Sequence, residues 1–145
     1  MKENMQIKLA ETDSDYLKCW DVIKELRPHL KKDEFLPMIK EMINEGYQLA
    51  YAEDNGKAVS AIGFRYLQFF FNGRHFYIDD LVTLPEYRGK GAAGMLLDYV
   101  TELAKEKGYA TVTLDSGHHR TDAHRLYLNK GYAIQAHHFV QYIKK

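Results

Sequence analysis

The sequence contains few features that would require an unusual environment. Cys19 is its only cysteine, so no internal disulfide can form and a reducing compartment is expected. No apolar run approaches the about 20 residues that a membrane-spanning helix needs. The first residues, MKENMQIKLAE, lack the apolar stretch of a signal peptide. These absences predict a cytoplasmic protein without a membrane partner.

The chain also has no excess of charge of either sign. It has 20 basic and 20 acidic residues, and so lacks the basic surface that nucleic-acid binding requires. It has no internal repeat, low-complexity tract or interdomain linker. Its 145 residues are 46% hydrophobic and 13% aromatic, enough to bury a core without metals or disulfides. A single domain, residues 1–145, is therefore predicted.

Hydrophobic periodicity and turn signals predict the element order β-α-α-β-β-β-α-β-α-β. Strands are expected at residues 6–10, 47–53, 58–71, 75–84 and 111–115, with a final hairpin or strand at 132–143. Helices are expected from the N-cap candidates at 12–14 to Pro28, and at 33–45, 91–107 and 121–129. Asp54-Asn55-Gly56-Lys57 is a strong hairpin signal, so the middle three strands should form an antiparallel meander.

The rest of the chain is organised around residues 77–95, YIDDLVTLPEYRGKGAAGM. They read as an apolar strand, a proline-bearing turn, a glycine-rich loop and the start of a helix. Such a loop offers backbone N–H groups at the positive end of a helix dipole, which favours a phosphate. Arg88 and Lys90 add charge-assisted donors, and Asp79 and Asp80 lie just upstream. The stretch predicts an enzyme that uses a phosphorylated cofactor.

A dinucleotide-binding site is one interpretation of this loop. Residues 89–94 match G-x-G-x-x-G, and Asp115 follows about 20 residues later. However, residues 84–88 separate the strand from the first glycine, and too little chain follows Gly94 for the alternating units of a dinucleotide fold. The element order therefore disfavours a dinucleotide-dependent oxidoreductase.

The second interpretation rests on the pattern Arg/Gln-x-x-Gly-x-Gly/Ala, which residues 88–93 satisfy. In its longer frame, IDDLVTLPEYRGKGAAGMLL closely resembles the acetyl-CoA loop of the GNAT N-acetyltransferases. The resemblance implies an α/β (α+β) domain with a mixed, mostly antiparallel sheet of six to seven strands and about four helices. It also implies acetyl-CoA as co-substrate. Its specific part spans residues 77–132, and the first half of the chain agrees in element order.

The resemblance further implies a set of coenzyme-binding residues. In the family, the strand before the loop pairs with pantetheine, one of its N–H groups polarises the thioester carbonyl, and the loop N–H groups bind the pyrophosphate. The residues so implied are Leu81, Val82 and Thr83 for pantetheine, and Gly89, Lys90, Gly91, Ala92, Ala93 and Gly94, reinforced by Arg88, for the pyrophosphate. Arg120 stands where the family often has Asn, and is expected to meet the coenzyme phosphates or an anionic acceptor.

The resemblance implies three catalytic candidates. Asp79 and Asp80 match the paired acids from which the family usually draws its general base, often through a water molecule. Adjacent side chains of a strand point to opposite faces, so at most one should face the reacting centre, with Asp79 slightly favoured. The alternative is that the acids pair with basic neighbours or bind the acceptor's cation. Tyr127, in the family's A-x-x-x-Y-x-x-x-G-[FY] ending, is the implied general acid to the departing thiolate.

The acceptor is a primary amine of uncertain identity. The ending from Arg120 to Tyr132, with His138-Phe139 downstream, resembles that of the aminoalkylphosphonate N-acetyltransferases. Amino sugars, polyamines, amino acids and protein lysines or N-termini stay open, as does an acyl-CoA sensor without turnover. Glu34, Phe35 and Tyr47 are candidate acceptor contacts, or simply parts of ordinary amphipathic elements.

Two further clusters have less specific interpretations. Five histidines gather in the last third of the chain, at positions 118, 119, 124, 137 and 138. No cysteine joins them and their spacing matches no structural zinc pattern, so no metal is expected. One of these histidines could serve as the general base in place of an aspartate. Phe69, Phe70 and Phe71 are compatible with a homodimer interface, and burial under the protein's own helices explains them equally well.

Overall fold

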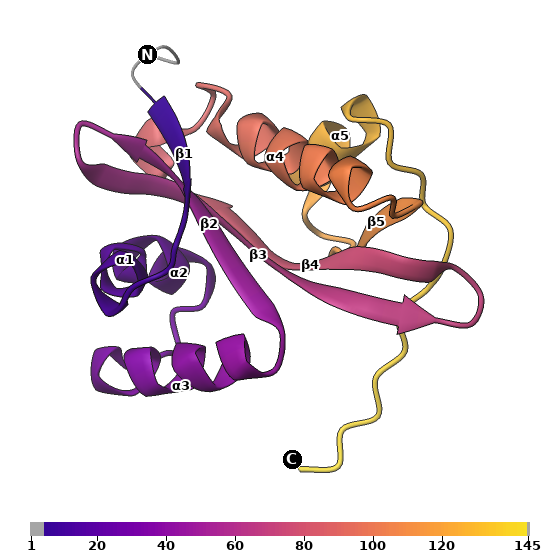
Figure 1. The fold of residues 1–145 in the computed structure, drawn as a ribbon, viewed down its shortest axis with the longest axis horizontal. Coiled ribbons are helices and arrows are strands. Elements are labelled where there is room, and N and C mark those ends of the chain that lie inside the picture. Colours follow the sequence, from indigo (N-terminus) through magenta and orange to yellow (C-terminus); the bar gives the residue numbers. More distant parts are fainter. Residues whose placement is uncertain (1–4, 145) are drawn as a thin grey trace. The chain divides into compact units, whose positions relative to one another are not determined.

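The computed structural model describes residues 5–144. These residues form two compact units, which are divided between Leu114 and Asp115. The first contains a five-stranded sheet whose spatial order follows the sequence (Figure 1). Its strands are β1 (Met5–Leu9), β2 (Tyr47–Asp54), β3 (Lys57–Phe69), β4 (Gly73–Thr83) and β5 (Thr111–Leu114). Pairs β1–β2, β2–β3 and β3–β4 are antiparallel, as the meander prediction requires, and β4–β5 is parallel.

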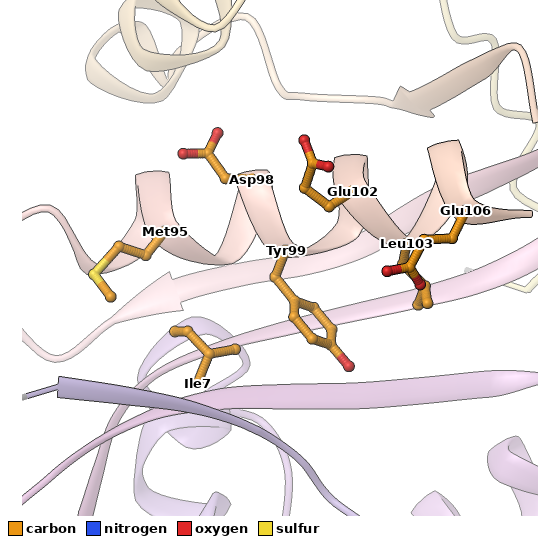
Figure 2. A pocket seen from close by; sticks show the side chains of 7 residues that line it. All are labelled: Ile7, Met95, Asp98, Tyr99, Glu102, Leu103 and Glu106. Atoms are coloured by element: carbon orange, nitrogen blue, oxygen red, sulfur yellow. The ribbon is translucent and has the colours of Figure 1, made fainter.

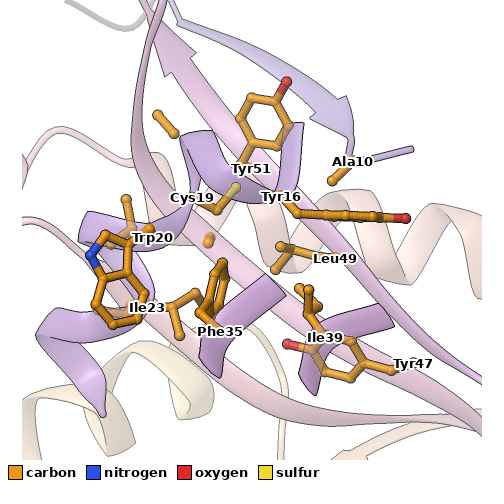
Figure 3. Close-up of a cluster of buried hydrophobic side chains, with 14 of the residues drawn as sticks. Ala10, Tyr16, Cys19, Trp20, Ile23, Phe35, Ile39, Tyr47, Leu49 and Tyr51 are labelled. Atoms are coloured by element: carbon orange, nitrogen blue, oxygen red, sulfur yellow. The ribbon is translucent and has the colours of Figure 1, made fainter. Parts of the chain in front are cut away.

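Helices of the first unit pack on both faces of this sheet (Figure 1). They are α1 (Asp13–Lys18), α2 (Trp20–Leu26), α3 (Lys32–Asn44) and α4 (Ala92–Glu106). Alternate residues of β2, Tyr47, Leu49 and Tyr51, form the main core with α1, α2 and α3 (Figure 3). On the other face, Ala92 of α4 packs with Ala52 of β2. The period-two alternation of a strand thus places two cores on one sheet.

The first predicted helix is two helices in the structure. The Cys19 N–H donates to the carbonyl of Tyr16, three residues back, and Cys19 then serves as N-cap of α2. At the start of α1, the Thr12 hydroxyl accepts from the Asp15 N–H at 3.2 Å in a capping box. Backbone N–H groups of Glu11 and Thr12 donate to the Asp15 carboxylate and lower its pKa. The helix is interrupted at Cys19, where this side chain is buried in the core, and hydrophobic periodicity alone does not predict the interruption.

The predicted hairpin signal is confirmed. Only Asn55 and Gly56 separate β2 from β3, with φ of 51° and 81°. Positive φ at both central residues defines the type I′ turn, whose twist matches that of the flanking strands.

Cys19 is expected to resist thiol reagents in the folded protein. Its side chain has 0% exposure, and burial, followed by the charge of Asp15, raises the pKa of its thiol to about 12. Only the thiolate is nucleophilic, so the thiol stays unreactive at neutral pH. A chromogenic disulfide reagent should leave native protein unlabelled while urea-unfolded protein reacts fully. Equal labelling of both forms would contradict this burial.

The second unit contains α5 (Thr121–Asn129), the range that the sequence predicts. The final hairpin or strand predicted at residues 132–143 is not formed; within residues 5–144 the sheet has five strands rather than six to seven. Its apolar side chains are exposed at Ile134, Phe139, Val140, Tyr142 and Ile143. A β-favouring sequence forms a strand only where a neighbouring strand satisfies its backbone, and the pattern does not specify that neighbour.

Candidate active site

The outer edge of β4 is only partly paired. β5 pairs with it over four residues, from His75↔Thr111 to Ile78↔Leu114. β4 continues to Thr83 while β5 ends at Leu114, so within the first unit residues 79–83 have no strand partner on this side. The backbone groups of this stretch that point away from β3 can therefore pair with an extended ligand.

The register on the other side of β4 identifies which groups point outward. The Leu84 N–H donates to the Val59 carbonyl on β3 at 2.9 Å. Hydrogen-bonded and non-hydrogen-bonded pairs alternate along an antiparallel ladder, so the backbone groups of Leu81 and Thr83 point away from β3. Those of Val82 point toward β3, and its carbonyl also accepts from the Ser60 hydroxyl at 2.8 Å. Of the three residues implied for pantetheine, Leu81 and Thr83 have the suitable backbone direction.

The glycine-rich loop leads from this edge to the N-terminus of α4. A 3-10 turn, η2 (Pro85–Tyr87), is followed by Gly89 and Gly91 with φ of 79° and 87°. Gly91 is the N-cap of α4, and no side chain caps the helix. The first backbone bond of α4 runs from Met95 N–H to the Gly91 carbonyl, so the N–H groups of residues 92–94 lie at the helix end. This geometry suits an anion.

Two cations flank the loop. The Lys90 ammonium lies 5.1 Å from the centre of the Tyr87 ring, and an Arg88 nitrogen lies 3.9 Å from a Glu25 carboxylate oxygen. The Arg88 side chain is 61% exposed, so this contact leaves its guanidinium accessible to a ligand.

A β-bulge places Asp79 and Asp80 on one face of the sheet. Gly63 pairs with Asp80 and Phe64 with Ile78, which leaves Asp79 as the extra residue. Asp79 binds Arg65 and Asp80 binds Tyr47, and these two partners lie directly opposite each other on β3 and β2. The expectation that the two acids face opposite sides is therefore wrong, because it assumed a regular strand.

The two carboxylates differ in how they are bound. Both oxygens of Asp79 contact the Arg65 guanidinium, at 2.6 to 3.1 Å. Asp80 accepts from Arg27 only at Oδ1, at 3.2 and 2.9 Å, while its Oδ2 accepts the Tyr47 hydroxyl at 2.8 Å. Arg27 also donates to the Asp79 carbonyl at 3.3 Å. Two aspartates and two arginines thus form a cluster without net charge.

The other candidate acceptor contacts divide between core and surface. Phe35 is 4% exposed and packs on Trp20 with ring centres 5.1 Å apart, so it belongs to the core (Figure 3). Glu34 is exposed on α3. Tyr47 is also buried, but its hydroxyl reaches Asp80; burial and then the charge of Asp80 raise its pKa well above the usual value.

In the second unit, Tyr127 lies on α5 with its ring centre 5.9 Å from that of Tyr132. Burial raises the pKa of Tyr127, and the positive charge of Arg120 opposes that shift. Arg120 is the N-cap of α5, and an Arg125 nitrogen lies 3.8 Å from the Asp122 carboxylate.

Among residues 5–144, no group of three or more metal-ligating side chains is assembled.

Comparison with known proteins decides the family. The model of the acetyltransferase (GNAT) family matches residues 9–132. The chain belongs to this family. It is 30% identical over 137 residues to the uncharacterized N-acetyltransferase YhdJ of Bacillus subtilis, covering 93% of this chain and 96% of that protein. It is 33% identical over 125 residues to the aminoalkylphosphonate N-acetyltransferase of Salmonella typhimurium, covering 84% and 79%.

Solved structures agree on the fold. AAC(6')-Iy in complex with a CoA bisubstrate analogue superposes with a TM-score of 0.79 at 20% identity, covering 97% of this chain and 98% of that one. The predicted α/β class and the GNAT family are thereby confirmed, and the protein is a GNAT-type N-acetyltransferase. Acetyl-CoA is the acyl donor of this family. Among the described helices, none is long and apolar enough to cross a membrane.

A hollow of about 430 Å³ lies elsewhere on this GNAT domain, between β1 and α4 (Figure 2). Ile7, Met95, Tyr99 and Leu103 form its apolar surface, with carboxylates on α4 beside them. None of the residues implied for acetyl-CoA lines it. An extended chain with phosphates needs backbone donors, whereas this hollow is lined by apolar side chains and carboxylates.

Sequence reasoning missed Arg27, Arg65 and Gly63. Arg27 meets Asp80 across 53 positions and Arg65 meets Asp79 across 14, so no local pattern reports either pairing. Gly63 did carry a signal, because a glycine inside an apolar strand often marks the close approach of another group.

Proposed function

We propose that this GNAT enzyme transfers acetyl from acetyl-CoA to the primary amine of a small molecule by direct attack on the thioester. The observation that carries the proposal is the unpaired β4 edge leading into an uncapped helix N-terminus. A pantetheine chain and a pyrophosphate would need these two features in this order. The family model matches residues 9–132, which include parts of both units.

In this proposal, backbone groups of Leu81 and Thr83 pair with pantetheine, and one of their N–H groups polarises the thioester carbonyl. Val82 keeps the strand in register with β3. The pyrophosphate is bound by the N–H groups of residues 89–94, with Arg88 and Lys90 supplying charge. Small residues in this segment let the backbone approach the phosphates. Arg120 is proposed as a further cation on its motif position alone.

The chemistry requires two proton movements. A free alkylamine has a pKa of about 10.4, so the acceptor must lose a proton before its lone pair attacks the carbonyl carbon. We assign that proton to Asp80, directly or through a water, because its Oδ2 is not bound by arginine. As the C–N bond forms and the C–S bond breaks, Tyr127 protonates the thiolate. Its raised pKa keeps this hydroxyl protonated at neutral pH.

The acceptor is proposed to be an amine that also carries an anionic group, such as an aminoalkylphosphonate. One relative is named for that substrate class. The cluster of Asp79, Asp80, Arg27 and Arg65 supports the idea, since it offers both carboxylates for an ammonium and guanidinium groups for an anion. A purely cationic polyamine would gain less from a cluster without net charge. Cytoplasmic location and a homodimer stay predictions.

The test is thiol release from acetyl-CoA across a panel of amines that includes aminomethyl- and aminoethylphosphonate. Turnover should be highest with an anionic amine, and Tyr127→Phe should lower kcat by about tenfold or more, as expected for loss of a general acid. Tyr142→Phe is the matched control, since this side chain in the same unit is exposed.

The other outcomes of this assay are equally informative. Saturable acetyl-CoA binding without turnover of any amine would contradict a small-molecule acceptor and favour a protein substrate or a sensor. Failure to bind acetyl-CoA would contradict the assignment of the loop.

A further inference from the structure

Tyr47 reaches the acid strand by crossing β3. It lies on β2, pairs with Arg65 of β3, and places its hydroxyl 2.8 Å from Asp80 Oδ2 on β4. The ring is 3% exposed, and the Arg65 guanidinium carbon lies 5.4 Å from its centre. A side chain that spans a whole strand needs an opening in that strand.

Gly63 supplies this opening. It lies on β3 directly opposite Asp80, and a Cβ built at this position would lie 1.7 Å from the Tyr47 hydroxyl oxygen and 2.4 Å from the ring carbon that bears it. No side chain other than hydrogen fits while the tyrosine keeps its place. Gly63 is not one of the glycines with a positive φ, so the close approach of Tyr47, rather than the backbone conformation, explains why a glycine is needed here.

The hydroxyl of Tyr47 donates to Asp80 Oδ2, the one carboxylate oxygen of the acid pair to which no arginine donates a hydrogen bond. Arg65 binds both oxygens of Asp79, and Arg27, at the C-terminal end of α2, binds Oδ1 of Asp80. Oδ2 of Asp80 therefore has a neutral donor, which fixes its direction without cancelling its charge. An oxygen held in this way is oriented and is still able to accept a proton from a second partner.

We infer that Tyr47, passing through the opening at Gly63, is a positioning residue that holds Asp80 Oδ2 toward the acceptor amine. The inference rests on the proposed function, because it gives Asp80 the proton of the acceptor. The side chains facing Asp80 come from four elements or their ends: Arg27 after α2, Tyr47 on β2, and the Arg65–Asp79 pair on β3 and β4. Glu45, after α3, acts electrostatically on Arg65.

The test compares Tyr47→Phe with Tyr51→Phe in the 145-residue chain. Tyr51 is a matched control, since it is 2% exposed on the same face of β2 and its hydroxyl bonds Asp15, at 3.4 Å, instead. Loss of the Tyr47 hydroxyl should lower kcat about 10- to 100-fold, the worth of one hydrogen bond to a charged group, and leave the KM for acetyl-CoA unchanged. The acidic limb of the kcat profile should move to higher pH, because the ionised carboxylate loses a donor.

Gly63→Ala tests the opening itself. It should lower the melting temperature and reduce kcat at least as much as Tyr47→Phe, and the two losses should not add in the double variant, since both act on one contact. If Gly63→Ala does not fold, Tyr47→Phe alone decides. Unchanged kcat and pH profile in Tyr47→Phe, with an active wild type, would overturn the inference alone. A wild type inactive with every amine would overturn the proposed function as well.

Discussion

Replacing Asp80 with Asn should lower kcat by about 10²- to 10⁴-fold, the range typical of losing a general base. The amide keeps the shape of the side chain and can still accept at its oxygen, but it cannot take a proton from the acceptor amine. The loss of kcat should become smaller as pH rises toward the pKa of the amine, about 10.4, because hydroxide in solution then removes the proton from the amine. Steady-state thiol release as a function of pH measures both effects.

Asp79→Asn is the matched control for this experiment. It too breaks a carboxylate–arginine pair of the same cluster, with Arg65 instead of Arg27, and should destabilise the fold comparably. Because both Asp79 oxygens already bind Arg65, its kcat should fall much less. Equal losses in the two variants at equal stability would contradict the assignment of Asp80 as the base.

Gly91→Val should weaken the binding of acetyl-CoA about 10- to 100-fold, measured as a rise in the KM for acetyl-CoA. Gly91 has φ of 87°, a left-handed conformation that costs residues with a Cβ about 1–2 kcal/mol. We expect the valine loop to relax from this conformation in the free protein, so that acetyl-CoA binding must restore it, and about 1.4 kcal/mol is tenfold in affinity. A β-branched side chain should also crowd the backbone next to the N–H groups of residues 92–94.

A donor without phosphates separates this effect from a general loss of structure. Acetyl-pantetheine contacts only the proposed β4 edge, so Gly91→Val should leave its kcat/KM nearly unchanged. Ala110→Val, at the exposed residue just before β5, controls for adding the same side chain away from the loop. An equal loss with both donors would show that the loop does not bind the pyrophosphate.

The sequence by itself determined the parts of this protein that depend on near neighbours. The hairpin at Asn55-Gly56 and the range of α5 follow from turn chemistry and helical spacing. The segment from Arg88 to Gly94, where a loop leads into a helix, follows from its glycines and cations, because the φ preference of a residue and the number of N–H donors in a segment are local properties. The same local pattern carried the family assignment, which the family match confirms.

Only the tertiary structure decided how the two acids are used. The bulge at Asp79, the crossing of Tyr47 over Gly63 and the pairing of Arg27 with Asp80 join segments far apart in sequence. The same limit explains the error at residues 132–143, where a β-favouring pattern has no strand partner in the structure. Alternation predicts which side chains share a face only while a strand stays regular and paired, and only the folded sheet determines where it does.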